Sequence, residues 1–232
     1  MKAHTILIKP KYLLTMLIAV GIILSFTGCC EEFYTVGSSS AKTVGEDVKK
    51  QMIDTDNPTD INIAIGTQRV IGDDDVANAL ESYKDVRRED YKEQGDQAYR
   101  KDNYKLAIKY YEDALKWTDN QNKEEKAAIY KELASIYSGL AYREEEKAQF
   151  ANRDEHYREA ARNYIRSAEN STKITDKAYL YREAAYRTYR SGSRSGACLL
   201  LNQTMELYLK DPNLKNSVGY IESDKKQFGC KF

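Results

Sequence analysis

The chain has 232 residues, of which 31% are charged, and its formal net charge is zero, so a strongly basic nucleic-acid-binding domain is excluded. That length is sufficient for one sizeable domain with additions at its ends. Only three prolines and long stretches of Ala, Glu, Lys, Arg and Leu favour a helix-rich protein.

Residues 1–30 have the pattern of an export signal or a membrane anchor. An uncharged, mainly apolar stretch from Leu13 to Gly28 follows three lysines. As a helix it would span about 24 Å, which is marginal for a bilayer. The small residue before a cysteine resembles the lipobox of prokaryotic lipoproteins, which implies lipid attachment at Cys29. The alternative is an uncleaved anchor, and with either one we expect the rest of the chain outside the cytoplasm.

Residues 31–74 are predicted to be a linker or a small irregular region. The Gly- and Ser-rich stretch from Gly37 has the composition of a flexible tether. The segment INIAIGTQRVI, residues 61–71, alternates enough to suggest one or two short strands. The acidic run that ends at Asp75 is typical of the beginning of a helix, and it lacks the glycine and glutamate of a calcium-binding loop.

Residues 75–212 are predicted to form a helical domain, and small side chains recur within it at fixed distances. Gly95 is followed twelve residues later by Ala107, and Tyr111 and Ala114 come next at helical spacing. Because Gly95 and Ala107 lack bulk, two antiparallel helices can approach closely at these positions. Asn103 is placed to cap the second of the two helices.

This spacing resembles the tetratricopeptide repeat, with Tyr91 at the tryptophan-like position of the first helix. In a second unit, Asn122 and Glu125 are predicted to form a capping box at the start of the first helix. This unit has long arms and is expected to turn near Asn152, where Glu155 would complete a second capping box; one unbroken helix is the alternative. A third unit would turn at Gly192, with Ser193 as the cap. The packing positions of the second and third units are Tyr130, Ala134, Ala160, Tyr164, Tyr181, Ala185 and Ala197.

The resemblance implies an all-α protein, a short α-solenoid of about three such hairpins with the second one elongated. Residues 213–232, after Pro212, are predicted to be a polar tail. That tail contains Cys230, which an oxidising compartment would permit to pair with Cys198. Sequence alone does not place the two Cα atoms within bridging distance, so a disulfide and two free thiols both stay open.

In this repeat family the first helices of the hairpins line a groove that holds peptide segments. The corresponding positions here are Glu89, Lys92, Asp96, Tyr99, Arg100, Lys131, Ser135, Ser138, Tyr179, Arg182, Tyr186, Tyr189 and Arg190. Five of them are basic and two are acidic, so we expect the groove to prefer acidic segments or a C-terminal carboxylate. The alternative is that the tyrosines only pack the helices together.

Catalysis is not expected. His156 is the only histidine beyond the N-terminal segment, and it is predicted to be exposed in the turn of the long hairpin. Zinc-type cysteine spacing and a phosphate-binding loop are missing from the sequence, so no metal, cofactor or small-molecule substrate is expected. The sequence therefore predicts a membrane-tethered scaffold or adaptor for protein segments. The alternative is a structural subunit of an envelope complex whose repeat surface serves self-association.

Overall fold

The structure is a computed structural model, and it describes residues 57–231. These belong to one compact unit, Thr55–Phe232. The predictions for residues 1–30, for Cys29 and for the linker up to residue 56 lie outside the described residues. The described elements are α3 (Pro58–Ile71), α4 (Asp74–Arg100), α5 (Tyr104–Lys116), α6 (Lys123–Glu146), α7 (Phe150–Asn170), α8 (Ile174–Arg190), α9 (Arg194–Lys210), the short 3₁₀ turn η2 (Lys215–Ser217) and α10 (Val218–Gln227).

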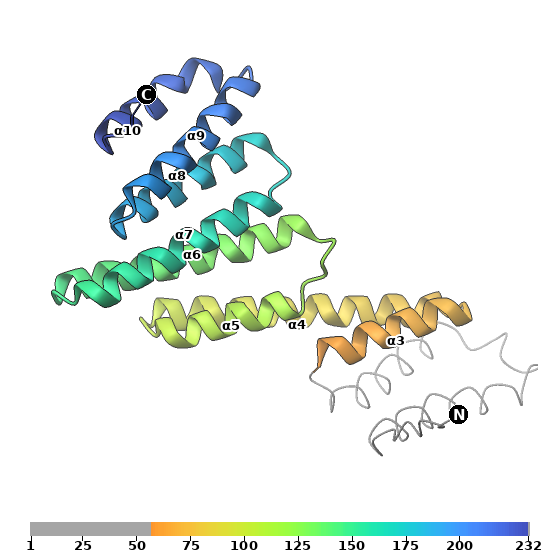
Figure 1. Cartoon of the computed structure of the whole chain (residues 1–232). Helices are drawn as coiled ribbons and strands as arrows, with labels where there is room; N and C mark the ends of the chain where they lie inside the picture. The colour runs from red at the N-terminus through yellow and green to blue at the C-terminus, as the bar shows by residue number, and fades with distance from the viewer. Residues whose placement is uncertain (1–56, 232) are drawn as a thin grey trace, which may run out of the picture. The chain divides into compact units, whose positions relative to one another are not determined.

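The described helices pack mainly against their neighbours in the sequence, as Figure 1 shows. Helices α4 and α5 form the first hairpin, α6 and α7 the second, and α8 and α9 the third. The second hairpin is the one with two long arms, since α6 and α7 have 24 and 21 residues whereas α8 and α9 have 17 each. In the first hairpin α4 has 27 residues but packs against α3 as well as α5, and α5 has only 13. The predicted all-α solenoid of about three hairpins is therefore confirmed.

Polar caps set where several helices begin. The side chain of Asn103 accepts a hydrogen bond from the Leu106 amide at the start of α5, and Asn122 accepts one from the Glu125 amide at the start of α6. Both caps were predicted, as was the left-handed backbone of Gly192, whose φ is 91°. Ser193 precedes α9 but makes no side-chain capping bond.

The turn of the long hairpin lies earlier than predicted. Helix α7 begins at Phe150, so Asn152 and Glu155 are inside the helix and the capping box expected there was wrong. Ala148 makes the reversal with a φ of 56°, although it is not a glycine. The pattern gave no signal for this bend because the turn contains neither glycine nor proline.

Small residues occupy the places where helices cross, so the helices pack closely against each other. Gly95, Ala107, Ala114, Ala134, Ala160, Ala185 and Ala197 are all buried, as are the rings of Tyr111 and Tyr164. Tyr91, Tyr130 and Tyr181 are partly buried beside them. At Gly95 the ring of Tyr111 lies so close that an added Cβ would be 2.8 Å from its Cδ2 and Cε2 atoms.

The strand prediction for residues 61–71 was wrong, because this segment belongs to helix α3. Asn57 caps the helix by accepting a hydrogen bond from the Thr59 amide, Pro58 occupies its first turn, and Gly72 ends it in the left-handed conformation. Ile61 and Ile65, one helical turn apart, are the buried residues. The helical period therefore prevails over the apparent alternation.

The predicted polar tail is also folded. Helix α10 buries Ile221 and Phe228, and the disulfide between Cys198 and Cys230 joins its end to α9 with a Cα–Cα distance of 5.6 Å. The pattern missed this helix because only a few apolar residues, spaced one or two turns apart, carry its contact with the third hairpin.

We predict that Gly95→Ala destabilises the protein although alanine is the better helix former. The ring of Tyr111 is 3% exposed and cannot move aside freely. Overpacking costs about 1–3 kcal/mol, and the 2.8 Å approach to two atoms of a buried ring places this substitution in the upper half of that range. Alanine gains about 1 kcal/mol in helix propensity, so we expect a net loss of about 1–2 kcal/mol. Gly66→Ala in α3 is the matched control, since no atom lies within 4 Å of its added Cβ. Urea unfolding should show that the control is at least as stable as the parent; a Gly95→Ala protein equally stable would contradict the packing argument.

Candidate partner-binding surface

The predicted groove residues come from the first helix of each hairpin, as expected. Those of the first hairpin lie on α4, those of the second on α6 and those of the third on α8. The structure does not leave their charges free, however. Many of the predicted groove cations already contact carboxylates of the same chain, and these contacts decide which positions are accessible to a ligand.

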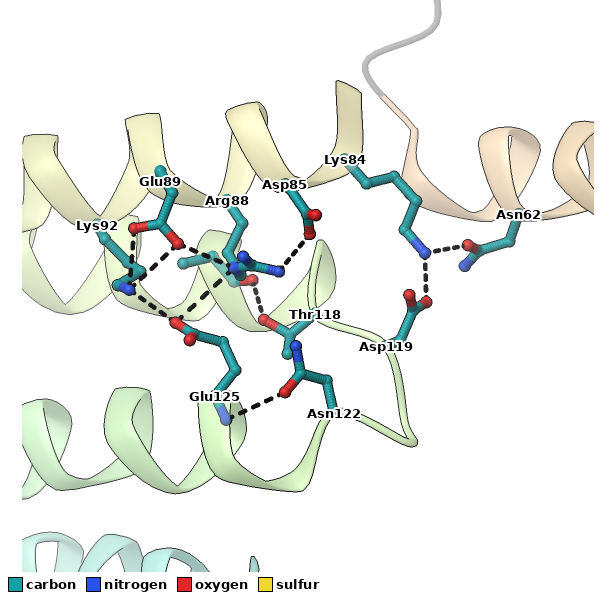
Figure 2. A network of polar contacts seen from close by, with 11 residues as sticks. Asn62, Lys84, Asp85, Arg88, Glu89, Lys92, Thr118, Asp119, Asn122 and Glu125 are labelled. Carbon is teal, nitrogen blue, oxygen red and sulfur yellow. Dashed lines mark hydrogen bonds and ion pairs between the residues drawn. The ribbon is translucent and has the colours of Figure 1, made fainter. Parts of the chain in front are cut away.

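At the junction of α4 and α6, Lys92 is held by two carboxylates (Figure 2). Its Nζ atom lies 2.7 Å from Glu125 Oε1 and 3.0 Å from Glu89 Oε2. Arg88 reaches the same Glu125 at 3.7 Å and pairs with Asp85 at 2.7 Å. Partial burial acts to lower the pKa of Lys92, but the two carboxylates outweigh it and raise that pKa. Lys92 therefore joins two hairpins and is not an unoccupied ligand contact.

A buried lysine connects three further segments at the edge of the same network. Lys84 on α4 is 3% exposed, and its ammonium donates hydrogen bonds to Asn62 on α3 and to Asp119 in the loop before α6. Figure 2 shows both partners pointing toward it. An open hollow of about 780 Å³ lies beside it, lined by polar residues that include Glu81, Asn120 and Lys126. Sequence reasoning missed Lys84, although its position one turn after Leu80 places it on the buried face of α4.

Next to this junction the surface of the first two hairpins is acidic. Asp96 accepts a hydrogen bond from the hydroxyl of Tyr111. Burial of the ring and the neighbouring Asp96 raise the pKa of Tyr111. Glu132 on α6 keeps an exposed surface, yet partial withdrawal of its carboxyl from water and the charge of Asp96 raise its pKa. A ligand carboxylate placed here would be repelled.

On the third hairpin, helix α10 covers three of the predicted groove residues. Asp224 of α10 accepts hydrogen bonds from Arg182 Nε at 2.6 Å and from the Tyr186 hydroxyl at 2.7 Å. The ring of Phe228 stacks on Tyr189 with a centroid separation of 4.2 Å. The chain's own C-terminal helix thus occupies the place that the sequence assigned to a partner.

The remaining predicted residues divide into paired and accessible ones. Arg190 contacts Glu145 and the hydroxyl of Tyr157. Ser138 accepts a hydrogen bond from Arg187, while Ser135 donates to the carbonyl of its own helix. Arg100 and Lys131 are exposed, and neither takes part in an ion pair within residues 57–231. Tyr99, which is 40% exposed and packs edge-on against Tyr104, and Tyr179, which is 50% exposed, are also accessible.

Groups that could carry chemistry are sparse in the described part of the chain. There, no set of three or more His, Cys, Asp or Glu side chains is arranged to hold a metal ion. His156 lies within α7, partly buried and 6.2 Å from the ring of Tyr137, so its predicted place in the turn was wrong. Among the helices between residues 57 and 231, none combines the length and apolar character that a bilayer crossing requires.

Comparison with known proteins adds no assignment. The chain matches no protein-family model, and no curated protein sequence proved similar to it. The function has to be inferred from the residues themselves.

The contact between Lys84 and Asp119 predicts that removing one partner lowers the stability of the protein more than removing the other. Asp119→Ala should destabilise the protein by about 1–3 kcal/mol, because it leaves a buried ammonium without its counter-charge. Lys84→Met should change stability by only about 1 kcal/mol or less, because Asp119, with its side chain 56% exposed, returns to water. Urea titration of both variants checks this. A larger loss for Lys84→Met than for Asp119→Ala would show that packing, not charge, gives Lys84 its role.

The raised pKa of Glu132 predicts a pH-dependent penalty. Because the folded state binds this proton more tightly than the unfolded chain, stability should fall as the pH rises from the ordinary glutamate value through the raised one. Glu132→Gln is expected to raise the melting temperature at pH 7 and to lose that advantage near pH 4. Glu206→Gln, at an exposed position on α9, is the control. If the melting temperatures of the parent and Glu132→Gln depended on pH in the same way, the raised pKa of Glu132 would be refuted.

Proposed function

We propose that the chain is a membrane-tethered, extracytoplasmic scaffold or adaptor built from repeats of the tetratricopeptide type. The observation that carries the proposal is the stack of helical hairpins, whose first helices carry accessible tyrosine and cationic side chains. Stacked hairpins of this kind form extended surfaces suited to binding segments of other proteins. The N-terminal pattern that ends at Cys29 supports the tether and the extracytoplasmic side.

The accessible side chains restrict the class of ligand that can bind. Arg100 and Lys131 are exposed cations, and the accessible Tyr99, next to Arg100 in the chain, supplies rigid aromatic contact area. We therefore expect an acidic segment or a C-terminal carboxylate to bind at these two cations and to avoid the neighbouring carboxylates of Asp96 and Glu132. This site is smaller than the groove inferred from sequence, because Lys92, Arg182 and Arg190 are engaged within the chain.

A second candidate function is self-association as a structural subunit. It is favoured by large apolar side chains exposed at the C-terminal end of the stack, where Leu199 and Leu209 are 61% and 55% exposed and Tyr220 is 65% exposed. A terminal repeat usually presents a polar outer face to water. Light scattering of the detergent-solubilised chain separates the two functions, since a stable oligomer that fails to bind acidic peptides supports the second.

The binding proposal predicts a specific loss on charge reversal. The full chain in detergent micelles is titrated with a fluorescent Glu- and Asp-rich peptide, at low salt and at 0.5 M salt. The double variant Arg100→Glu, Lys131→Glu should weaken binding about tenfold or more, because two charge-assisted contacts are lost. High salt should weaken the parent in the same direction.

The matched control reverses two exposed lysines on α5, the second helix of the first hairpin, Lys105→Glu and Lys109→Glu. It changes the net charge equally but leaves the first helices intact. Equal weakening in both double variants would mean that only the overall charge attracts the peptide, and the assigned site would be wrong.

A further inference from the structure

The face of α8 under α10 presents polar and aromatic groups side by side. It offers Arg182 and the Tyr186 hydroxyl to a carboxylate, and it offers the rings of Tyr186 and Tyr189 to an aromatic side chain. In the structure these groups receive Asp224 and Phe228, which are 4% and 2% exposed. The carboxylate of Asp224 corresponds to the acidic ligand that the sequence predicted for these positions, whereas the aromatic contact of Phe228 was not predicted.

Helix α10 shows what an occupant of this face needs. The buried residues of α10 are Ile221 and Asp224, and Phe228, the residue that directly follows the helix, is also buried. These positions i, i+3 and i+7 lie on one side, which makes the contact. The other side faces away from the contact, with Tyr220 65% exposed. A short helix with an aliphatic residue, a carboxylate three positions later and an aromatic ring four positions after that would satisfy the same groups.

Helix α10 is held by two different means. With only 10 residues it would be marginal as an isolated helix in water, so it depends on its docking contacts. The disulfide between Cys198 on α9 and Cys230, just beyond the end of α10, tethers it covalently. Without the disulfide, the only covalent connection between α10 and α9 would be the chain segment that follows α9.

We propose that α10 is the resident ligand of the α8 face and that the Cys198–Cys230 disulfide is a latch. Reduction of the latch releases α10 and frees the face for a partner helix carrying the same aliphatic, acidic and aromatic pattern. This inference deepens the proposed function, on which it rests, by adding a second site whose occupancy depends on redox state.

The step needs a dithiol reductant. One of its thiolates attacks a sulfur of the disulfide and forms a mixed disulfide, and its second thiol then displaces the protein sulfur. Two electrons and two protons pass to Cys198 and Cys230, which become thiols, while the reductant becomes a disulfide. The same exchange in the opposite direction, in which the disulfide form of the reductant accepts the two electrons and two protons, closes the latch again.

The first experiment follows α10 directly. Hydrogen exchange of the full chain in detergent is measured with and without dithiothreitol. Faster exchange confined to residues 218–228, with α4–α7 unchanged, is the expected result. Unchanged exchange in α10 after complete reduction would overturn the proposal, because α10 would then be a permanent cap.

The second experiment measures binding of a fluorescent peptide copying residues 216–231 with C230S. Affinity for the full chain should rise at least tenfold on reduction. The C198S chain should bind equally well with and without dithiothreitol. The proposal is overturned if the reduced, folded chain does not bind the peptide. It is also overturned if the reduced chain forms dimers by exchanging α10 and therefore does not bind the peptide.

A charge exchange tests the contact and separates this inference from the proposed function. The D224K peptide should not bind the reduced parent but should bind the reduced R182E chain. If the D224K peptide fails to bind the R182E chain as well, the contact between Arg182 and Asp224 is not what recognises the helix. Reversal of Arg100 and Lys131 should leave binding of the α10 peptide unchanged. If only the acidic peptide binds, the latch proposal is wrong and the proposed binding of acidic segments is supported. If only the α10 peptide binds, the latch proposal is supported and the proposed binding of acidic segments is wrong.

Discussion

The close approach of helices at small side chains is the constraint on which the described structure depends. A single hairpin cannot bury its apolar face alone, so each one must pack against the next. Gly95 admits the ring of Tyr111, and buried alanines repeat this arrangement along the stack. Because interiors are packed to crystal-like density, there is little free volume at these crossings to absorb an added methyl group.

Charged residues take a second role once the helices are placed. Lys92, Arg182 and Arg190 would be ligand contacts on an isolated helix, but each one meets a carboxylate from another element. The pairs of Lys92 and Arg190 connect successive hairpins, the pair of Arg182 connects the third hairpin to α10, and all three reduce the number of free cations on the surface. Tyr99, Arg100 and Lys131 remain accessible, on the same two helices that carry the acidic residues Asp96 and Glu132.

The C-terminal helix connects architecture with function. It closes the last hairpin with Ile221 and Phe228, as a terminal element of a repeat array must, and it does so with the chemistry expected of a ligand. Burial of Asp224 is tolerated because Arg182 and Tyr186 satisfy its two oxygens. A cap built in this way can be replaced by a segment of similar composition, whereas a purely apolar cap would give no such specificity.

The sequence by itself determined the all-α class, the three hairpins, the long second hairpin and the caps at Asn103 and Asn122, because these follow from local spacing. It did not determine helix α3, whose isoleucines fit two periods, or the bend at Ala148, whose left-handed backbone has no residue signature. Only the tertiary structure decided which cations are paired, that Lys84 is buried, that Cys198 meets Cys230 and that α10 covers α8. Those facts join residues distant in the chain, such as Arg182 and Asp224, and periodicity within one helix carries no information about what another helix brings to it.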